Sequence, residues 1–307
     1  MSKVSVWLSA LRLRTLPLAA ASIILGAGLA THAQLFDLLI FSLSLSTALL
    51  LQILSNLAND YGDAVSGADN AQRVGPLRAM QTGTISLGSM KVAIIFTTFL
   101  VLISGISLLV VALGDNLNSW LVFLLLGLLA IIAAITYTMG KLPYGYRAMG
   151  DLAVFLFFGL LGVLGSYYLY GLTFSWSLLL PATSVGLLSS AVLNINNMRD
   201  IYTDKETRKT TLAVLWGRKN AFLYHLFLIG GALICAVGYL SQLENVQTWQ
   251  FVFLLSFTPL IKSCLVLKEA IFNDLRDGSV FNNELKNTAL STFVFSLLFA
   301  LVLIAMN

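Results

Sequence analysis

Two acidic clusters with similar spacing are the residues of this sequence best suited to chemistry. Each consists of an asparagine followed by two aspartates: Asn56, Asp60 and Asp63 in the first, and Asn196, Asp200 and Asp204 in the second. On a continuous helix these spacings place the three side chains of each cluster on one face. Four ionised carboxylates that converge raise one another's pKa unless cations lie between them. Mg²⁺ takes oxygen ligands and typically binds through one or two carboxylates plus a substrate phosphate. The clusters therefore predict a diphosphate held between Mg²⁺ ions.

Basic residues follow both clusters. Arg73 and Arg78 come after the first cluster, and Lys205, Arg208 and Lys209 come after the second. Arginine offers bidentate hydrogen bonds to phosphate and lysine offers a point charge, so this pattern favours a diphosphate over a bare metal ion. Two alternatives stay open. The acids pair with the six basic residues of loop 198–219, or the basic residues set the topology and contact anionic lipids.

A third polar segment, residues 137–151, closes one apolar stretch and opens the next. Its tyrosines, glycines and proline predict a structured loop rather than a helix. Tyr137, Tyr144 and Tyr146 are suited to stacking on an aromatic ligand or donating to a diphosphate. Asp151 lies at the start of the following stretch, where a helix N-terminus stabilises a negative charge, and simple helix capping is the alternative role.

The composition shows which elements must position these residues. Apolar residues make up 58% of the 307-residue chain, charged residues only 10%, and the mean hydropathy is +0.88. These values exclude an ordinary soluble enzyme and a nucleic-acid-binding protein, and no nucleic acid partner is expected. A bilayer-spanning helix needs about 20 apolar residues. Nine such stretches occur, at about 15–33, 36–57, 92–113, 119–139, 152–171, 177–197, 220–240, 249–267 and 288–306.

All 18 lysines and arginines lie on one side of these predicted spans. They occur in the N-terminal segment and in or beside the longer loops 58–91, 140–151, 198–219 and 268–287, whereas the short breaks on the other side contain none. By the positive-inside rule the N-terminus and the long loops are cytoplasmic. The expected fold is an all-α membrane protein in which nine transmembrane helices form one bundle, with residues 1–307 as a single domain and both acidic clusters at its cytoplasmic rim.

With these residues in place, the chain resembles the UbiA superfamily of intramembrane prenyltransferases. The details are most similar to the branch that prenylates 1,4-dihydroxy-2-naphthoate in menaquinone synthesis. The matching segments are RTLP at 14–17, NLANDYGDAVSGAD at 56–69, RVGPLR at 73–78, PYGY at 143–146 and NNMRDIYTDKETRKTT at 196–211. Many members of the superfamily carry an aspartate four residues after Asp63, but here that position is Gly67 and Asp69 follows, which leaves the role of Asp69 open.

The resemblance implies a Mg²⁺-dependent enzyme with the four aspartates as its catalytic carboxylates. Asn56, Asp60 and Asp63 would hold one Mg²⁺, and Asn196, Asp200 and Asp204 would hold the other. The enzyme would transfer a polyprenyl group from a polyprenyl diphosphate to 1,4-dihydroxy-2-naphthoate, with loss of CO₂ and diphosphate, to give demethylmenaquinol. The expected location is the bacterial inner membrane, with the active site on the cytoplasmic side and the bilayer around the isoprenoid tail. The implied diphosphate contacts are Arg14, Arg73, Arg78, Lys141 and Arg208. The expected contacts of the acceptor or the allylic carbocation are Tyr137, Tyr144, Tyr146, Asp151 and Phe155, with Phe157 and Phe158 as further π faces.

Three alternatives to this function remain. A UbiA-type enzyme with another aromatic acceptor, such as 4-hydroxybenzoate, would carry the same acidic clusters. A transporter is a different class, but transporters place charge near the midplane, often at broken helices. A CDP-alcohol phosphotransferase also uses Mg²⁺ and paired aspartates, but its usual Asp-Gly-x2-Ala-Arg pattern does not fit Asp63 to Asp69.

Overall fold

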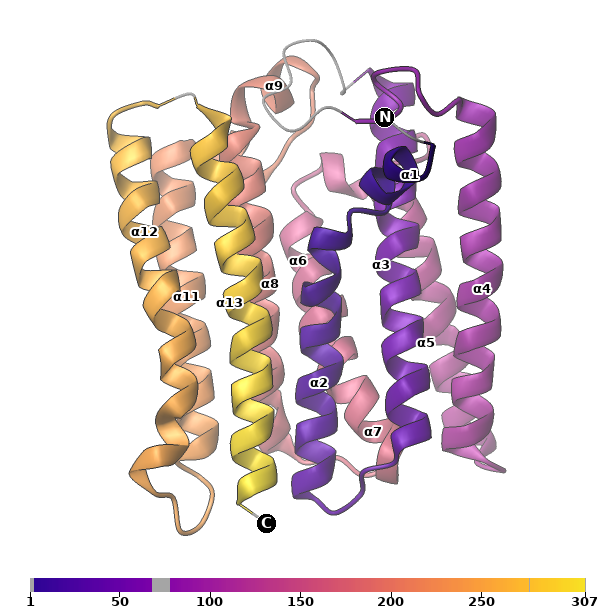
Figure 1. The fold of residues 1–307 in the computed structure, drawn as a ribbon, viewed down its shortest axis with the longest axis vertical. Helices are drawn as coiled ribbons and strands as arrows, with labels where there is room; N and C mark the ends of the chain where they lie inside the picture. The colour runs from indigo at the N-terminus through magenta and orange to yellow at the C-terminus, as the bar shows by residue number, and fades with distance from the viewer. Residues whose placement is uncertain (1–2, 68–77, 276, 307) are drawn as a thin grey trace.

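The structure is a computed structural model that describes residues 3–67, 78–275 and 277–306. Within these ranges the chain is almost entirely helical, and nine helical segments are long and apolar enough to cross a membrane. The long helices run side by side in one bundle, with the N-terminus at one end and the C-terminus at the other (Figure 1). The predicted all-α membrane class with nine spans is therefore confirmed for the part of the chain that the structure describes.

The first four spans comprise α1 to α5. The bounds are α1 (Lys3–Leu11), η1 (Leu13–Thr15), α2 (Leu16–His32), α3 (Leu38–Ser66), α4 (Leu87–Leu113) and α5 (Leu117–Thr136). The side chain of Asp37 caps the N-terminus of α3 by accepting from the backbone N–H groups of Leu39 and Ile40. At the other end Gly67, with φ of 76°, ends α3 in the left-handed conformation.

The remaining five spans, and the short helices η2, α9 and α10 that lie outside them, complete the chain. The bounds are η2 (Tyr144–Tyr146), α6 (Gly150–Val154), η3 (Phe155–Gly165), α7 (Ser166–Gly171), η4 (Trp176–Leu178), α8 (Leu179–Arg199), α9 (Ile201–Glu206), α10 (Leu212–Trp216), α11 (Arg218–Leu240), η5 (Thr248–Ser256), α12 (Phe257–Phe272) and α13 (Gly278–Ala305). The short helix α9 lies at the same end of the bundle as the N-terminus (Figure 1).

The fifth span is unusual because its middle part, η3, is a π-helix. Its glycines permit close approach to neighbouring helices. A Cβ on Gly159 would lie 2.7 Å from the Cα of Gly186 in α8, and a Cβ on Gly162 would lie 2.7 Å from the Cβ of Ser22 in α2. These glycines therefore allow the fifth span to pack closely against α8 and α2.

Several predicted helix boundaries were wrong at the charged end of the bundle. The ninth span begins at Gly278 rather than at 288, and the second extends to Ser66 rather than ending at 57. The second acidic cluster was predicted to continue one helix, but α8 ends at Arg199, and Asp200 is the residue between α8 and α9. Polar residues prolong these helices beyond the hydrophobic stretch because backbone hydrogen bonding, not hydropathy, sets where a helix ends.

Candidate active site

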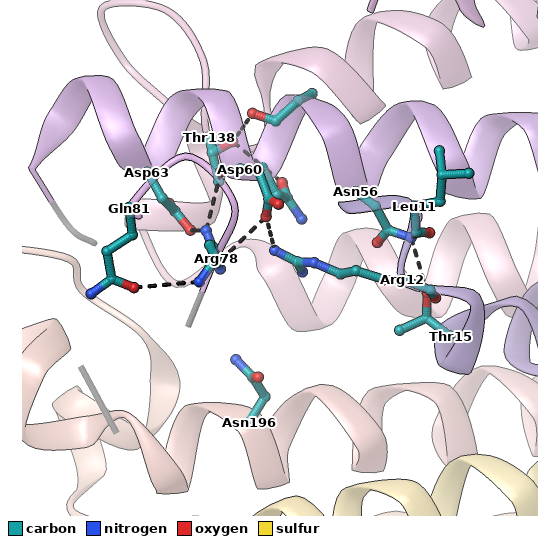
Figure 2. Close-up of polar contacts among 12 residues, drawn as sticks. Leu11, Arg12, Thr15, Asn56, Asp60, Asp63, Arg78, Gln81, Thr138 and Asn196 are labelled. Atoms are coloured by element: carbon teal, nitrogen blue, oxygen red, sulfur yellow. Dashed lines mark hydrogen bonds and ion pairs between the residues drawn. The ribbon is translucent and has the colours of Figure 1, made fainter. Parts of the chain in front are cut away.

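The first acidic cluster lies near the end of α3, where two arginines bind it. Arg12 forms an ion pair with Asp60. Arg78 lies between the two aspartates: its Nε is 3.3 Å from Asp60 Oδ1, and its Nη1 is 2.5 Å from Asp63 Oδ2 (Figure 2). The hydroxyl of Tyr146 donates to the other oxygen of Asp63 at 2.6 Å. Both carboxylates are buried, so these contacts offset the free energy that burying their charge costs.

Arg12 reaches Asp60 because of a sharp turn in the backbone. It is the residue between α1 and η1 and has left-handed dihedral angles, with φ of 50° and ψ of 54°. A non-glycine residue in this region is uncommon and costs free energy, so surrounding contacts must hold it there. The turn sets α1 against α3, where Val6 and Ala10 pack with Leu54 and Leu57.

Asn56 has different contacts from those predicted. Its Nδ2 donates to the carbonyl of Leu11 and the hydroxyl of Thr15, both at 3.0 Å, while its Oδ1 accepts from Gln52 at 3.1 Å (Figure 2). Its amide is fully used in attaching the Leu11–Thr15 turn to α3. In the structure Asn56 therefore supports the turn that carries Arg12, and it does not face the aspartates of its cluster.

The second acidic cluster is organised by Arg199. Its Nε and Nη2 bind the two oxygens of Asp200 at 2.8 and 2.6 Å. The same guanidinium donates to Asn196 at 2.8 Å and to Asn282 of α13 at 2.6 Å. Arg199 is buried, and its planar fork fixes Asp200 and Asn196 at the break between α8 and α9.

Asp204, the last member of the second cluster, faces Lys209. The Lys209 Nζ lies 3.2 Å from Asp204 Oδ1, while Asp204 Oδ2 is buried without a hydrogen-bond partner. Burial raises the pKa of Asp204 to about 6, although Lys209 opposes the shift. Burial of Lys209 favours its neutral form, but the charges of Asp204, Asp63 and Asp200 outweigh this effect and raise its pKa.

The loop after α5 joins the two clusters. Thr210 donates its N–H to the carbonyl of Tyr146 at 3.1 Å, and its own carbonyl accepts from Ala148 at 2.8 Å. This pairing places the Lys209 ammonium 5.7 Å from the centre of the Tyr146 ring. Because Tyr146 also binds Asp63, the chain of contacts Asp63–Tyr146–Lys209–Asp204 brings together the two clusters that the sequence predicted to converge.

Tyr137 and Tyr144 pack edge to face, with ring centres 5.3 Å apart. The Tyr144 hydroxyl donates to the carbonyl of Ala133 at 2.9 Å, and burial raises its pKa to about 12. Burial also raises the pKa of Tyr137, and the nearby charge of Asp151 adds to the effect. Both tyrosines are therefore neutral at physiological pH and present an uncharged aromatic surface.

A cavity of about 1010 Å³ extends from these charged groups into the bundle. At one end it is lined by Arg12, Arg14, Asn59, Asp60, Asp63, Arg78, Asn196, Arg199 and Lys209. Its walls elsewhere are mainly apolar and include Leu109, Phe123, Phe157, Phe158 and Leu169. Asp60 and Ser44 both line it from α3, and their sixteen-residue separation corresponds to about 24 Å along the helix.

The predicted site residues fall into three groups. Those on the cavity wall are Asp60, Asp63, Asn196, Arg14, Arg78, Tyr137 and Tyr144. Asp200, Asp204 and Tyr146 hold wall residues through the contacts above, and Asp151 is buried beside Tyr137. Of the others, Lys141 and Arg208 are exposed away from the wall, and Phe155 packs against Gly186 of α8. Arg73 and Asp69 lie outside the residues that the structure describes.

Two cations that bind the acids, Arg12 and Arg199, were absent from the predicted site, and Lys209 was predicted only as one of the basic residues that follow the second cluster. The pairing of Arg199 and Lys209 corresponds to the alternative in which the acids pair with the basic residues of loop 198–219, whereas Arg12 belongs to the N-terminal segment. Lys209 follows Asp204 by five residues and Arg199 precedes Asp200 directly, so their proximity was readable from the sequence. Arg12 lies 48 residues from Asp60 in the chain, and only the fold brings the two together.

The donor set is compatible with Mg²⁺. Among the described residues, no group of three or more His, Cys, Asp or Glu side chains is close enough to hold a metal ion unaided. Each cluster nevertheless offers two aspartates, and Asp204 has a buried oxygen without a partner. Mg²⁺ keeps several waters and shares its coordination with substrate phosphates, so two carboxylates per ion are sufficient.

The bundle and its cavity define a polytopic membrane protein with a charged site at one end of an apolar chamber. The chain belongs to the UbiA prenyltransferase family, whose sequence profile matches residues 19–270. It is 48% identical to the 1,4-dihydroxy-2-naphthoate octaprenyltransferase of Escherichia coli (strain K12), over 98% of this chain and 95% of the relative. It is 44% identical to the protein of the same name from Haemophilus influenzae, over 86% of this chain and 85% of the relative.

Solved structures share the fold. A UbiA homologue from Aeropyrum pernix K1 matches with a TM-score of 0.63 and 19% identity, over 92% of this chain and 94% of the other. A homologue from Archaeoglobus fulgidus, solved bound to DMAPP and Mg²⁺, matches with a TM-score of 0.59 and 17% identity, over 96% of this chain and 99% of the other. The resemblance inferred from the sequence motifs is therefore confirmed at the level of the family and its fold.

Proposed function

We propose that this protein transfers a polyprenyl group from a polyprenyl diphosphate to 1,4-dihydroxy-2-naphthoate, releasing diphosphate and CO₂ and forming demethylmenaquinol. The observation that carries the proposal is the cavity, which has acids and cations at one end and apolar walls beyond them. An anionic head group with a long hydrocarbon tail is the kind of ligand that matches both parts. The relatives named for this reaction support the acceptor, because the similarity to the first of them covers nearly the whole chain.

The head group would occupy the charged end. Asp60 and Asp63 would hold one Mg²⁺, and Asp200 and Asp204 with Asn196 would hold a second. Mg²⁺ would supply neutralisation of the negative charge that develops on the diphosphate as it leaves. Arg14 and Arg78 line this end of the cavity and would contact the phosphate oxygens directly. Lys141 and Arg208 are exposed away from the wall, so they would contribute only through movement of their loops. Arg73, which lies outside the described residues, stays a predicted diphosphate contact.

The remainder of the cavity would protect the reacting carbon. Departure of the diphosphate leaves an allylic carbocation, which water would capture if it had access. The apolar walls exclude water, and the rings of Phe157, Phe158, Tyr137 and Tyr144 offer π faces that stabilise a cation. The electron-rich dihydroxynaphthoate ring then attacks the cation, so no nucleophilic side chain is needed.

The location we propose is the bacterial inner membrane, with the active site facing the cytoplasm. The N-terminus and α9 lie at one end of the bundle (Figure 1). Asp204 belongs to α9, and Asp200 is the residue between α8 and α9. The N-terminal segment and the loops at this end carry most of the basic residues, and cytoplasmic loops are enriched in lysine and arginine. The surrounding bilayer would receive the polyprenyl tail and the product.

The experiment that tests this proposal is a product assay with purified protein in detergent. The protein would receive Mg²⁺, a polyprenyl diphosphate and either 1,4-dihydroxy-2-naphthoate or 4-hydroxybenzoate, with mass spectrometry of the product and trapping of CO₂. Prenylated naphthoquinol with CO₂ is the expected result. Prenylated hydroxybenzoate alone would overturn the acceptor, and no product from folded protein with either acceptor would overturn the proposed reaction.

A further inference from the structure

Lys286 occupies an unexpected position in the ninth span. The sequence placed it in a loop, but α13 begins at Gly278, so Lys286 lies about 12 Å along the helix from its start. Its side chain lines the cavity, and among the described residues it forms no ion pair. Lys286 is exposed and lies in the polar first turns of α13, before the apolar stretch, so its ammonium group can meet an anionic ligand.

An apolar patch forms part of the cavity wall to which α13, the helix of Lys286, contributes. Leu18 of α2 and Val192 of α8 belong to one small hydrophobic cluster, against which Phe158 of η3 and Leu285 of α13 pack. All four of these side chains also line the cavity. Four helical segments therefore contribute to this apolar patch, and Lys286, which follows Leu285 directly on α13, lines the same cavity.

This patch lies one helical turn from the second acidic cluster, as two helices show independently. On α13, Asn282 binds Arg199, and Lys286 follows it by four residues. On α8, Val192 precedes Asn196, another partner of Arg199, by four residues. Four residues of helix rise about 6 Å, a separation that suits a ring placed beside the carbon that carries the diphosphate.

A buried hydroxyl completes the patch. Ser189 lies three residues before Val192 on α8 and lines the cavity. Ser189 is fully buried, yet its Oγ has no hydrogen-bond partner among the described residues. A buried hydroxyl without a partner is costly, and a polar ligand group would satisfy it.

We propose that Lys286 binds the carboxylate of the aromatic acceptor and thereby determines which acceptors the enzyme selects. This inference rests on the proposed function. The naphthalene ring would lie between Phe158 and the aliphatic side chains of Leu18, Val192 and Leu285. Ser189 would bind a hydroxyl of the ring.

The position of Lys286 separates it from the cations that serve the diphosphate. Arg12, Arg78, Arg199 and Lys209 are each within ion-pair distance of an aspartate. Arg14 lies within electrostatic reach of three of those cations, so it belongs to the same end of the cavity. Lys286 lies a turn away on an apolar wall, where the acceptor rather than the diphosphate would be placed.

The test compares Lys286→Met, Lys286→Arg and the control Lys262→Met. Lys262 is an exposed lysine within the α12 span and is not on the cavity wall. The acceptor KM, for dihydroxynaphthoate, is measured with the polyprenyl diphosphate saturating. The donor KM, for the polyprenyl diphosphate, is measured with dihydroxynaphthoate saturating. Lys286→Met should raise the acceptor KM about tenfold or more, as expected for a lost hydrogen bond between charged groups, and leave the donor KM within about twofold. Lys286→Arg should restore most of the loss, and Lys262→Met should behave as wild type.

Direct binding separates this inference from the proposed reaction. Calorimetry with 1-hydroxy-2-naphthoate and with 1-naphthol needs no turnover and measures the contribution of the carboxylate. Lys286→Met should weaken binding of the naphthoate and leave binding of the naphthol unchanged. A rise in the donor KM alone would assign Lys286 to the diphosphate and overturn the inference. Unchanged affinity for the naphthoate would also overturn it and leave Lys286 as a contact for lipid phosphate. Failure of the wild type to prenylate dihydroxynaphthoate would instead count against the proposed function.

Discussion

Replacing Arg199 by lysine separates the geometry of the second acidic cluster from its charge. The guanidinium makes two bonds to Asp200 and one each to Asn196 and Asn282, with distances of 2.6 to 2.8 Å. A lysine ammonium keeps the charge but cannot reproduce the planar fork that binds both carboxylate oxygens. The substitution therefore removes at least one bond between charged groups in a site where the arginine side chain is only 4% exposed.

A hydrogen bond to a charged group contributes about 1.5–3 kcal/mol. At 1.4 kcal/mol per factor of ten, one lost bond corresponds to a decrease in kcat/KM of roughly 10- to 100-fold. If Asp200 and Asn196 hold Mg²⁺, their loss of orientation should also raise the Mg²⁺ concentration needed for half-maximal activity. Both quantities are obtained by titrating Mg²⁺ in the product assay.

The matched control for this prediction is Arg147→Lys. Arg147 is exposed, so the same chemical change there should leave activity and thermal unfolding close to wild type. The midpoint of thermal unfolding in detergent establishes whether Arg199→Lys remains folded. A folded Arg199→Lys variant with wild-type kcat/KM at every Mg²⁺ concentration would refute the reasoning, because it would show that the fork is not needed.

Two further predictions concern packing and metal dependence. Gly159→Ala should lower the thermal unfolding midpoint, because the new Cβ would lie 2.7 Å from Gly186 Cα. Overpacking of this kind costs about 1–3 kcal/mol. The control Gly230→Ala, whose Cβ would meet open space, should have little effect. Equal midpoints for the two variants would contradict the close packing of η3 on α8. Chelation of divalent ions by EDTA should abolish turnover, and added Mg²⁺ should restore it; activity that persists in EDTA would argue against a metal at the aspartates.

The spans were predictable because the hydrocarbon core of a bilayer requires a fixed length of apolar chain. Each of the nine predicted stretches overlaps an observed segment. The errors concentrate where polar residues prolong a helix. The start of α13 at Gly278 is one example, and it is what places Lys286 on the cavity wall instead of in a loop.

The candidate site was predictable where chemistry depends on residue type and spacing. The two aspartate pairs are linked through Tyr146 and Lys209, and a helix break at Asp200 rather than a continuous face positions the second pair. Side-chain direction could not be read from spacing. Phe155 packs on α8 while its neighbours Phe157 and Phe158 line the cavity, within a π-helical segment whose side chains do not follow the α-helical period.

The distribution of charge in the site explains why paired and unpaired cations have different roles. Four carboxylates are held by four cations, so the frame of the site is close to neutral and can remain buried before any ligand binds. Arg14 and Lys286 line the same cavity, and neither forms an ion pair with a described residue. Arg14 and Lys286 therefore give the cavity a net positive charge, which attracts anions. Both proposed substrates are anionic. Arg14 lies beside the acidic clusters, and Lys286 lies by the apolar patch. The cavity can therefore bind the diphosphate and the carboxylate at separate positions. Binding at two positions would orient the ring toward the reacting carbon.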